Sequence, residues 1–138
     1  MAYEFETSLE EIGKYMSSPV FFIDAEATVQ EAALKMHARE IGSLLVKKLS
    51  DYVGIISESD VIRKVVGAGR NPETTRVADV MTAPILTLDR FLPVVEAEKF
   101  MQKNRVRHLG VTEEGQLVGV LSVKDLVACY SKSFRVTE

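Results

Sequence analysis

The chain alternates between short apolar runs, which predict strands, and longer stretches whose apolar residues recur at helical spacing, which predict helices. Pro19 and Pro84 each precede one of the apolar runs, and proline commonly punctuates the entry to such an element. Short polar turns join the later runs in pairs, as in antiparallel hairpins. The predicted strands cover residues 20–23, 43–47, 52–56, 85–88, 108–112 and 116–121.

Two of the predicted helices begin at recognisable signals. Thr28 and Glu31 have the spacing of a capping box, in which each side chain accepts a hydrogen bond from a free amide of the first turn. Pro93 takes the corresponding place in the second helix, where proline suits the first turn. Two further helices are predicted to begin at Ser57 and Ser122. The apolar stripes of the first two helices are Val29, Ala32, Ala33 and Met36, and Val94, Ala97 and Met101.

The second half of the chain repeats the first half at an offset of 65 positions, from Met16 to Met81, without a gap. A repeat with one ungapped register indicates a tandem duplication. Residues that match at this offset include Val29 and Val94, Glu31 and Glu96, Met36 and Met101, Leu44 and Leu109, Gly54 and Gly119, Ser57 and Ser122, and Asp60 and Asp125.

Each repeat therefore reads as strand, helix, strand, strand, helix, which predicts an α+β fold. A unit of about 60 residues buries its own sheet face poorly, so we expect two β-α-β-β-α units packed sheet to sheet about a pseudo-two-fold axis, with clefts along the seam. The predicted organisation is an N-terminal extension (1–11), repeat 1 (12–66), a linker (67–75), repeat 2 (76–131) and a C-terminal tail (132–138).

Composition narrows the function. A net charge of −3 and a pI near 5.5 argue against nucleic acid as a partner, because binding a phosphate backbone requires a concentrated positive surface. The single cysteine, Cys129, allows neither an intrachain disulfide nor a cysteine-built zinc site. No apolar stretch is long enough for a membrane span, and Met1–Glu10 is acidic and lacks the apolar run of a signal peptide. We therefore predict a cytoplasmic protein.

The strongest candidate for chemistry is a motif that occurs once in each repeat, at Gly54–Asp60 and at Gly119–Asp125. Each copy places a strand glycine, two apolar residues, a serine at a helix start and an aspartate three residues later. Ser-x-x-Asp is close to a capping box, so capping alone is one interpretation. The other is ligand binding: an ionised carboxylate accepts hydrogen bonds from both hydroxyls of a ribose, and free amides at a helix start attract phosphate.

No pairing of a nucleophile with a base and no glycine-rich phosphate loop occurs in the sequence. His37 has no companion at metal-ligand spacing. We therefore predict no catalytic residues, no metal site and no enzymatic activity.

From about Ile12 to Tyr130 the chain resembles a stand-alone pair of CBS domains, whose pattern is Gly-apolar-apolar-Ser/Thr-x-x-Asp after a proline-entered strand, a helix and a hairpin. The resemblance implies a regulatory module that binds an adenosine-containing ligand. AMP is the first choice, and ATP, NAD and S-adenosylmethionine are the alternatives. No cofactor is required.

The resemblance also implies two clefts, each built from both repeats. By position, one cleft is expected to use Ser57, Ser59 and Asp60 with Arg107 and His108, and the other Ser122, Lys124 and Asp125 with Gly42 and Ser43.

Arg107 and His108 supply charge that Gly42 and Ser43 lack, so the Asp60 cleft is predicted to hold a phosphate more firmly. Lys124 at the other cleft would reverse this ranking if it contacts the phosphate. The chain departs from the family pattern at Gly110, where many members have proline, and at Ser59, where many have arginine.

Two functions remain open from the sequence. One is a ligand sensor that signals to an unidentified protein partner, and the other is a structural or interaction module of the same fold with empty clefts. The resemblance implies a homodimer of pairs that meet through helices. Apolar residues suited to such contacts, which core packing would also explain, are Val61, Ile62, Val65, Val66, Leu126 and Val127.

Overall fold

The structure is a computed structural model, and it describes residues 9–135 of the 138-residue chain, with the side chains of 132–135 excepted. The chain divides into two compact units. One unit spans Phe21–Ile85 and is called the Asp60 unit here. The other combines residues 9–20 with residues 86–135 and is called the Asp125 unit.

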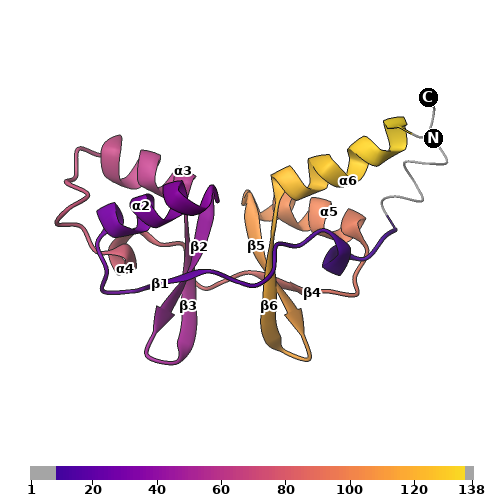
Figure 1. The fold of residues 1–138 in the computed structure, drawn as a ribbon, viewed down its shortest axis with the longest axis horizontal. Coiled ribbons are helices and arrows are strands. Elements are labelled where there is room, and N and C mark those ends of the chain that lie inside the picture. Colours follow the sequence, from indigo (N-terminus) through magenta and orange to yellow (C-terminus); the bar gives the residue numbers. More distant parts are fainter. Residues whose placement is uncertain (1–8, 136–138) are drawn as a thin grey trace. The chain divides into compact units, whose positions relative to one another are not determined.

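The Asp60 unit contains a three-stranded sheet in the order β1-β2-β3 (Figure 1). Strand β1 pairs with β2 in parallel, and β2 pairs with β3 antiparallel. The elements of this unit are β1 (Phe22–Asp24), α2 (Val29–Arg39), β2 (Ser43–Lys48), β3 (Asp51–Ser57), α3 (Glu58–Asp60), the π-helix η2 (Val61–Val66) and α4 (Val77–Val80).

The Asp125 unit has the same sheet, in the order β4-β5-β6. Its pairing repeats that of the first sheet at an offset of 65: Phe22 pairs with Leu45, and Thr87 pairs with Gly110. The elements of this unit are the 3-10 helix η1 (Ile12–Lys14), β4 (Thr87–Asp89), α5 (Val94–Asn104), β5 (His108–Glu113), β6 (Gln116–Ser122) and α6 (Val123–Arg135). The predicted α+β class and the tandem β-α-β-β-α repeat are confirmed.

Three local features differ from the predicted elements. Strands β1 and β4 begin two residues later than predicted, and the short helices η1 and α4 were not predicted. Residues 61–66 form a π-helix, whereas their counterparts in repeat 2 lie in the regular α-helix α6. The second helices therefore differ between the repeats although their capping residues are the same.

The compact units do not coincide with the sequence repeats, because each repeat gives its opening segment to the other unit. The Ile12 amide donates to the Leu92 carbonyl at 2.9 Å, and the Val77 amide donates to the Ala27 carbonyl at 2.8 Å. Ile12 is fully buried in the core of the Asp125 unit, and Val77 in that of the Asp60 unit. The domain boundaries drawn from the repeat stay a prediction, as does the packing of the units about a pseudo-two-fold axis.

Candidate functional site

The glycine of each motif allows a second segment to cross its strand at close range. A Cβ at Gly54 would lie 2.9 Å from the carbonyl oxygen of Thr82, and one at Gly119 would lie 3.0 Å from that of Ser17. The first distance is shorter than Cβ contacts allow, and the second is tighter than most of them, so a side chain at either position requires the neighbouring backbone to shift. The crossing segments are held by paired backbone hydrogen bonds, from Thr82 to Ile55 and from Ser17 to Val120. Glycine thus brings Thr82 to the start of α3.

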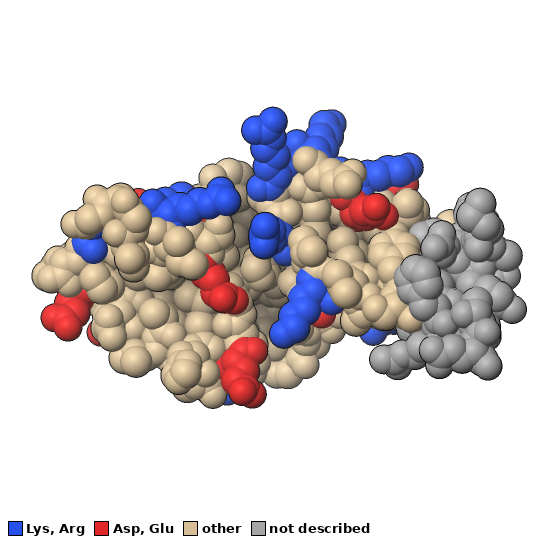
Figure 2. Space-filling model, turned by 90° about the horizontal axis from the view of Figure 1, so that it is seen from above, with Lys and Arg blue, Asp and Glu red and all other residues tan. Residues whose placement is uncertain are grey.

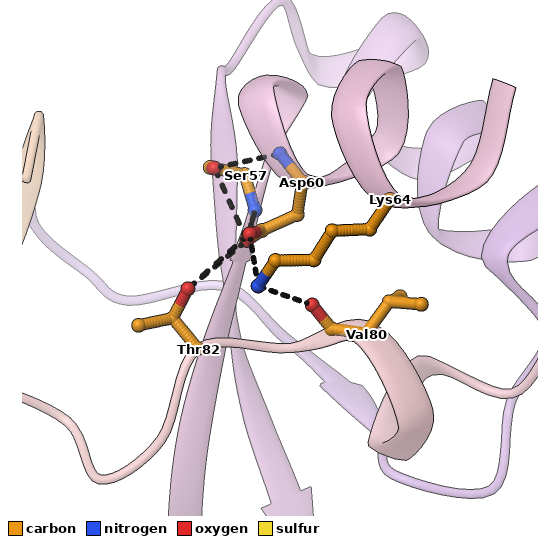
Figure 3. A network of polar contacts seen from close by, with 5 residues as sticks. All are labelled: Ser57, Asp60, Lys64, Val80 and Thr82. Atoms are coloured by element: carbon orange, nitrogen blue, oxygen red, sulfur yellow. Dashed lines mark hydrogen bonds and ion pairs between the residues drawn. The ribbon is translucent and has the colours of Figure 1, made fainter. Parts of the chain in front are cut away.

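Ser57 and Asp60 form the capping box that the spacing predicts (Figure 3). The Asp60 amide donates to Ser57 Oγ at 3.3 Å, and the Ser57 amide donates to Asp60 Oδ2 at 3.0 Å. Ser57 Oγ also donates to Asp60 Oδ2, at 3.2 Å. These contacts satisfy free amides of the first helical turn and fix the carboxylate at the end of β3.

Two more side chains, neither of them predicted from the sequence, contact the Asp60 carboxylate (Figure 3). The Lys64 ammonium lies 2.9 Å from Asp60 Oδ1 and donates to the Val80 carbonyl at 3.1 Å. Thr82 Oγ1 donates to Asp60 Oδ1 at 3.2 Å. The Asp60 side chain is only 8% exposed, whereas that of Lys64 is 46% exposed. The i, i+4 spacing of Asp60 and Lys64 was a readable signal for the ion pair.

The second motif repeats the capping box at Ser122 and Asp125. The Asp125 amide donates to Ser122 Oγ at 3.2 Å, and the Ser122 amide donates to Asp125 Oδ2 at 2.8 Å. Ser122 Oγ donates to the same oxygen at 3.0 Å. Within the part of the chain that the structure describes, Asp125 Oδ1 accepts no hydrogen bond, and Asp125 is only partly buried.

The remaining predicted site residues lie beside the motif of their own unit. Ser43 pairs with Ser57 across β2 and β3, and His108 pairs with Ser122 across β5 and β6. The Arg107 carbonyl accepts a hydrogen bond from the Val123 amide at 2.9 Å, which places Arg107 next to the start of α6. In the Asp60 unit, the Gly42 carbonyl accepts a hydrogen bond from the Glu58 amide at 3.0 Å. The grouping of each motif with residues of the other repeat stays a prediction.

Positive side chains accompany the start of α6. Arg107 and Lys124 are both exposed, whereas their counterparts in the Asp60 unit, Gly42 and Ser59, carry no charge. Figure 2 views the molecule from above Figure 1, and lysine and arginine side chains gather there on the part that includes α6. The positive charges of Arg107 and Lys124 favour an anionic ligand group at the Asp125 motif.

Other candidates for chemistry are sparse in the described residues. Residues 9–135 contain no group of three or more His, Cys, Asp or Glu side chains that would hold a metal ion. Within the same residues, no helix is both long enough and apolar enough to cross a membrane. Tyr130 donates to Glu98 at 2.7 Å, and burial, followed by this carboxylate, raises the pKa of the Tyr130 phenol.

The sequence and fold match known proteins over most of the chain. The model of the CBS domain matches twice, at residues 9–67 and 77–132. The chain is 31% identical over 120 residues to the mitochondrial CBS domain-containing protein CBSX3 of Arabidopsis thaliana, and this match covers 83% of the chain and 58% of that protein. The chain spans about half the length of the curated relatives it first matches.

Two solved structures show the same fold. A putative signal-transduction protein with CBS domains from Burkholderia ambifaria is 31% identical, with a TM-score of 0.80, over 85% of this chain and 90% of that one. A hexameric CBS-CP12 protein from bloom-forming cyanobacteria is 28% identical, with a TM-score of 0.81, over 86% of this chain and 67% of that one. Both CBS matches coincide with the repeated sheets and motifs described above, and the chain therefore belongs to the CBS domain family, with two such domains in tandem.

Proposed function

We propose that the chain is a regulatory module that binds an adenosine-containing nucleotide at its Ser-x-x-Asp motifs and signals the binding to a protein partner. AMP is the first choice of ligand, with ATP, NAD and S-adenosylmethionine as alternatives. In this proposal the module catalyses no reaction and requires no cofactor. Its cytoplasmic location stays a prediction.

The observation that carries the proposal is the duplicated hydrogen-bond geometry of the two motifs. In both copies a serine hydroxyl, a carboxylate and the first-turn amides converge at the end of a strand. A carboxylate can accept from two ribose hydroxyls, and amides at a helix start attract phosphate. The signal-transduction description of the Burkholderia relative supports the regulatory part of the proposal.

The Asp60 motif favours a second function, in which the chain is an interaction module that binds no nucleotide. All the contacts described for the Asp60 carboxylate come from the chain itself, and they stabilise the start of α3 without a ligand. If both aspartates only cap helices, no adenosine compound will stabilise the protein.

A thermal-shift panel with AMP, ADP, ATP, NAD and S-adenosylmethionine tests the proposal. A ligand that binds only the native state stabilises it by about 2.7 kcal/mol at a hundredfold excess over Kd, so one member should raise the melting temperature. Asp125→Ala should lower the affinity for that ligand about tenfold or more, because each charge-assisted hydrogen bond contributes about 1.5–3 kcal/mol. Glu114→Ala, an exposed change in the β5–β6 turn, is the control. If none of the five compounds raises the melting temperature, the result favours the interaction module.

We also propose that two copies associate through the outer face of α6. An apolar groove of about 310 Å³ lies between α5 and α6, and Val123 and Val127 remain 39% and 59% exposed beside it. Val123 and Val127 are four residues apart on α6, so they lie on one face of the helix and are suited to a helix–helix contact. The hexameric state of the cyanobacterial relative supports self-association. The residues that line the groove are Glu98, Val123, Leu126, Val127, Tyr130 and Ser131.

Val127→Glu should convert the dimer to a monomer, because a charge in the groove must be desolvated when two copies meet. Analytical ultracentrifugation at micromolar concentration measures this. Leu34→Glu is the matched control, since Leu34 is similarly exposed at 57% but lies on α2. A wild-type monomer, or a Val127→Glu dimer as tight as wild type, would contradict the proposed surface.

A further inference from the structure

The two motifs differ in how many acceptor positions of the carboxylate the protein itself occupies. A carboxylate offers about four such positions on its two oxygens. At Asp60, Oδ1 accepts from Lys64 at 2.9 Å and Thr82 at 3.2 Å, and Oδ2 accepts from the Ser57 amide and hydroxyl. Asp60 is therefore saturated, and it is also buried.

The Asp125 carboxylate has half as many of its acceptor positions occupied by the described protein groups. Its Oδ2 accepts from the amide and the hydroxyl of Ser122, at 2.8 and 3.0 Å. Among the described residues, without the side chains of 132–135, nothing donates to its Oδ1. This carboxylate, which is partly exposed, therefore keeps an oxygen with which to accept hydroxyl donors from a ligand.

Two side-chain differences between the repeats produce this asymmetry. The counterpart of Lys64 in repeat 2 is Cys129, a buried thiol that carries no ammonium with which to form such an ion pair. The counterpart of Thr82 is Ser17, whose backbone makes the same pair of hydrogen bonds to the neighbouring strand. The Ser17 side chain makes no hydrogen bond to Asp125 in the described structure. The two units share the backbone arrangement, and the side chains at these two positions determine how many hydrogen bonds each aspartate accepts.

Charge near the two motifs differs in the same direction. The first turn beside Asp60 carries Glu58, whose counterpart is the neutral Val123. Beside Asp125 lie the exposed cations Arg107 and Lys124. The Lys64 ammonium is neutralised by the Asp60 carboxylate, so the residues around each helix start favour an anionic ligand group at the Asp125 motif.

We propose that Lys64 is a built-in counter-ion that blocks the Asp60 motif, so that the chain binds one anionic, diol-bearing ligand, through Asp125. The inference rests on the proposed function for the nature of the ligand. It reverses the ranking drawn from the sequence, in which the Asp60 cleft held the phosphate more firmly. A ligand diol at Asp60 must displace the Lys64 ammonium, whose full positive charge neutralises the carboxylate in a way that neutral hydroxyls do not.

Lys64→Met removes the ammonium, keeps an unbranched side chain of similar length, and should open the Asp60 motif. Isothermal titration with AMP, ATP, NAD and S-adenosylmethionine, each used separately, should give one site per wild-type chain and two per Lys64→Met chain. Lys64→Arg retains the charge and should keep one site. Asp125→Ala should leave wild type with no measurable site and Lys64→Met with one. Circular dichroism melts verify that each variant is folded before titration.

The outcomes separate this inference from the proposed function. Wild type with two equal sites, or Lys64→Met that still binds one ligand, overturns the block by Lys64 while nucleotide binding stands. Binding that appears only in Lys64→Met supports the block and counts against nucleotide binding by the natural chain. No binding by either protein to any of the four compounds overturns both.

Discussion

Asp60→Ala is expected to lower the free energy of unfolding by about 3 kcal/mol, whereas Asp125→Ala should cost only about 1 kcal/mol. The two aspartates make the same capping box, so the difference isolates the additional partners of Asp60. Removal of the buried carboxylate leaves Thr82 Oγ1 without its acceptor and the Lys64 ammonium without its counter-charge. Lys64 is 46% exposed and can regain water, which keeps the cost at the lower end for a broken buried ion pair.

Urea denaturation of the wild type, Asp60→Ala and Asp125→Ala measures this difference in the free energy of unfolding. The slope of free energy against denaturant should stay the same, since the surface exposed on unfolding is unchanged. Lys64→Met combined with Asp60→Ala should lose less than the sum of the single changes, because the two residues contact each other. Equal losses for Asp60→Ala and Asp125→Ala would show that Lys64 and Thr82 add nothing to the stability of the first motif.

Gly54→Ala is expected to destabilise the protein by about 1–3 kcal/mol, the usual cost of forcing an extra group into a packed site. The new Cβ would lie 2.6 Å from Met81 Sδ and 2.9 Å from the Thr82 carbonyl oxygen. The methionine sulfur can move, but the carbonyl belongs to a backbone that is paired with Ile55 in both directions. Relief of the clash therefore pushes Thr82 away from Asp60.

Thermal or urea denaturation of Gly54→Ala measures the loss of stability. Asp51→Ala introduces the same residue into the same strand at an exposed position and should change stability little. Because the substitution displaces Thr82, Gly54→Ala should also reduce the stability difference between Asp60→Ala and Asp125→Ala when each is made in its background. An unchanged stability of Gly54→Ala would mean that the crossing segment yields at no cost, contrary to the paired hydrogen bonds.

Local patterns in the sequence were sufficient for much of the fold. The offset of 65 between Met16 and Met81 reappears in the strand register, from the pairing of Ser43 with Ser57 to that of His108 with Ser122. The capping boxes at Ser57 and Ser122 form as their spacing predicts. These features depend on contacts between residues close in the chain or on a duplicated pattern, and both can be identified from the sequence alone.

The candidate site was predicted in part. The serine and aspartate of each motif were identified, but Lys64 and Thr82 were not, and neither was the saturation of Asp60. The contact of Thr82 with Asp60 joins residues 22 positions apart in the chain. It depends on a segment that crosses β3 at Gly54, which no periodicity reveals.

By itself, then, the sequence determined the duplication at an offset of 65, the α+β class and the capping of both motifs, because short-range hydrogen bonds and runs of apolar residues follow residue order. Tertiary structure alone decided three further features: the exchange of opening segments between units, the π-helix at residues 61–66, and the contact of Thr82 with Asp60. The spacing of apolar residues does not distinguish a short π-helix from an α-helix. The exchange and the Thr82 contact depend on which distant segments pack together, because residue order does not reveal which backbone segment crosses β3.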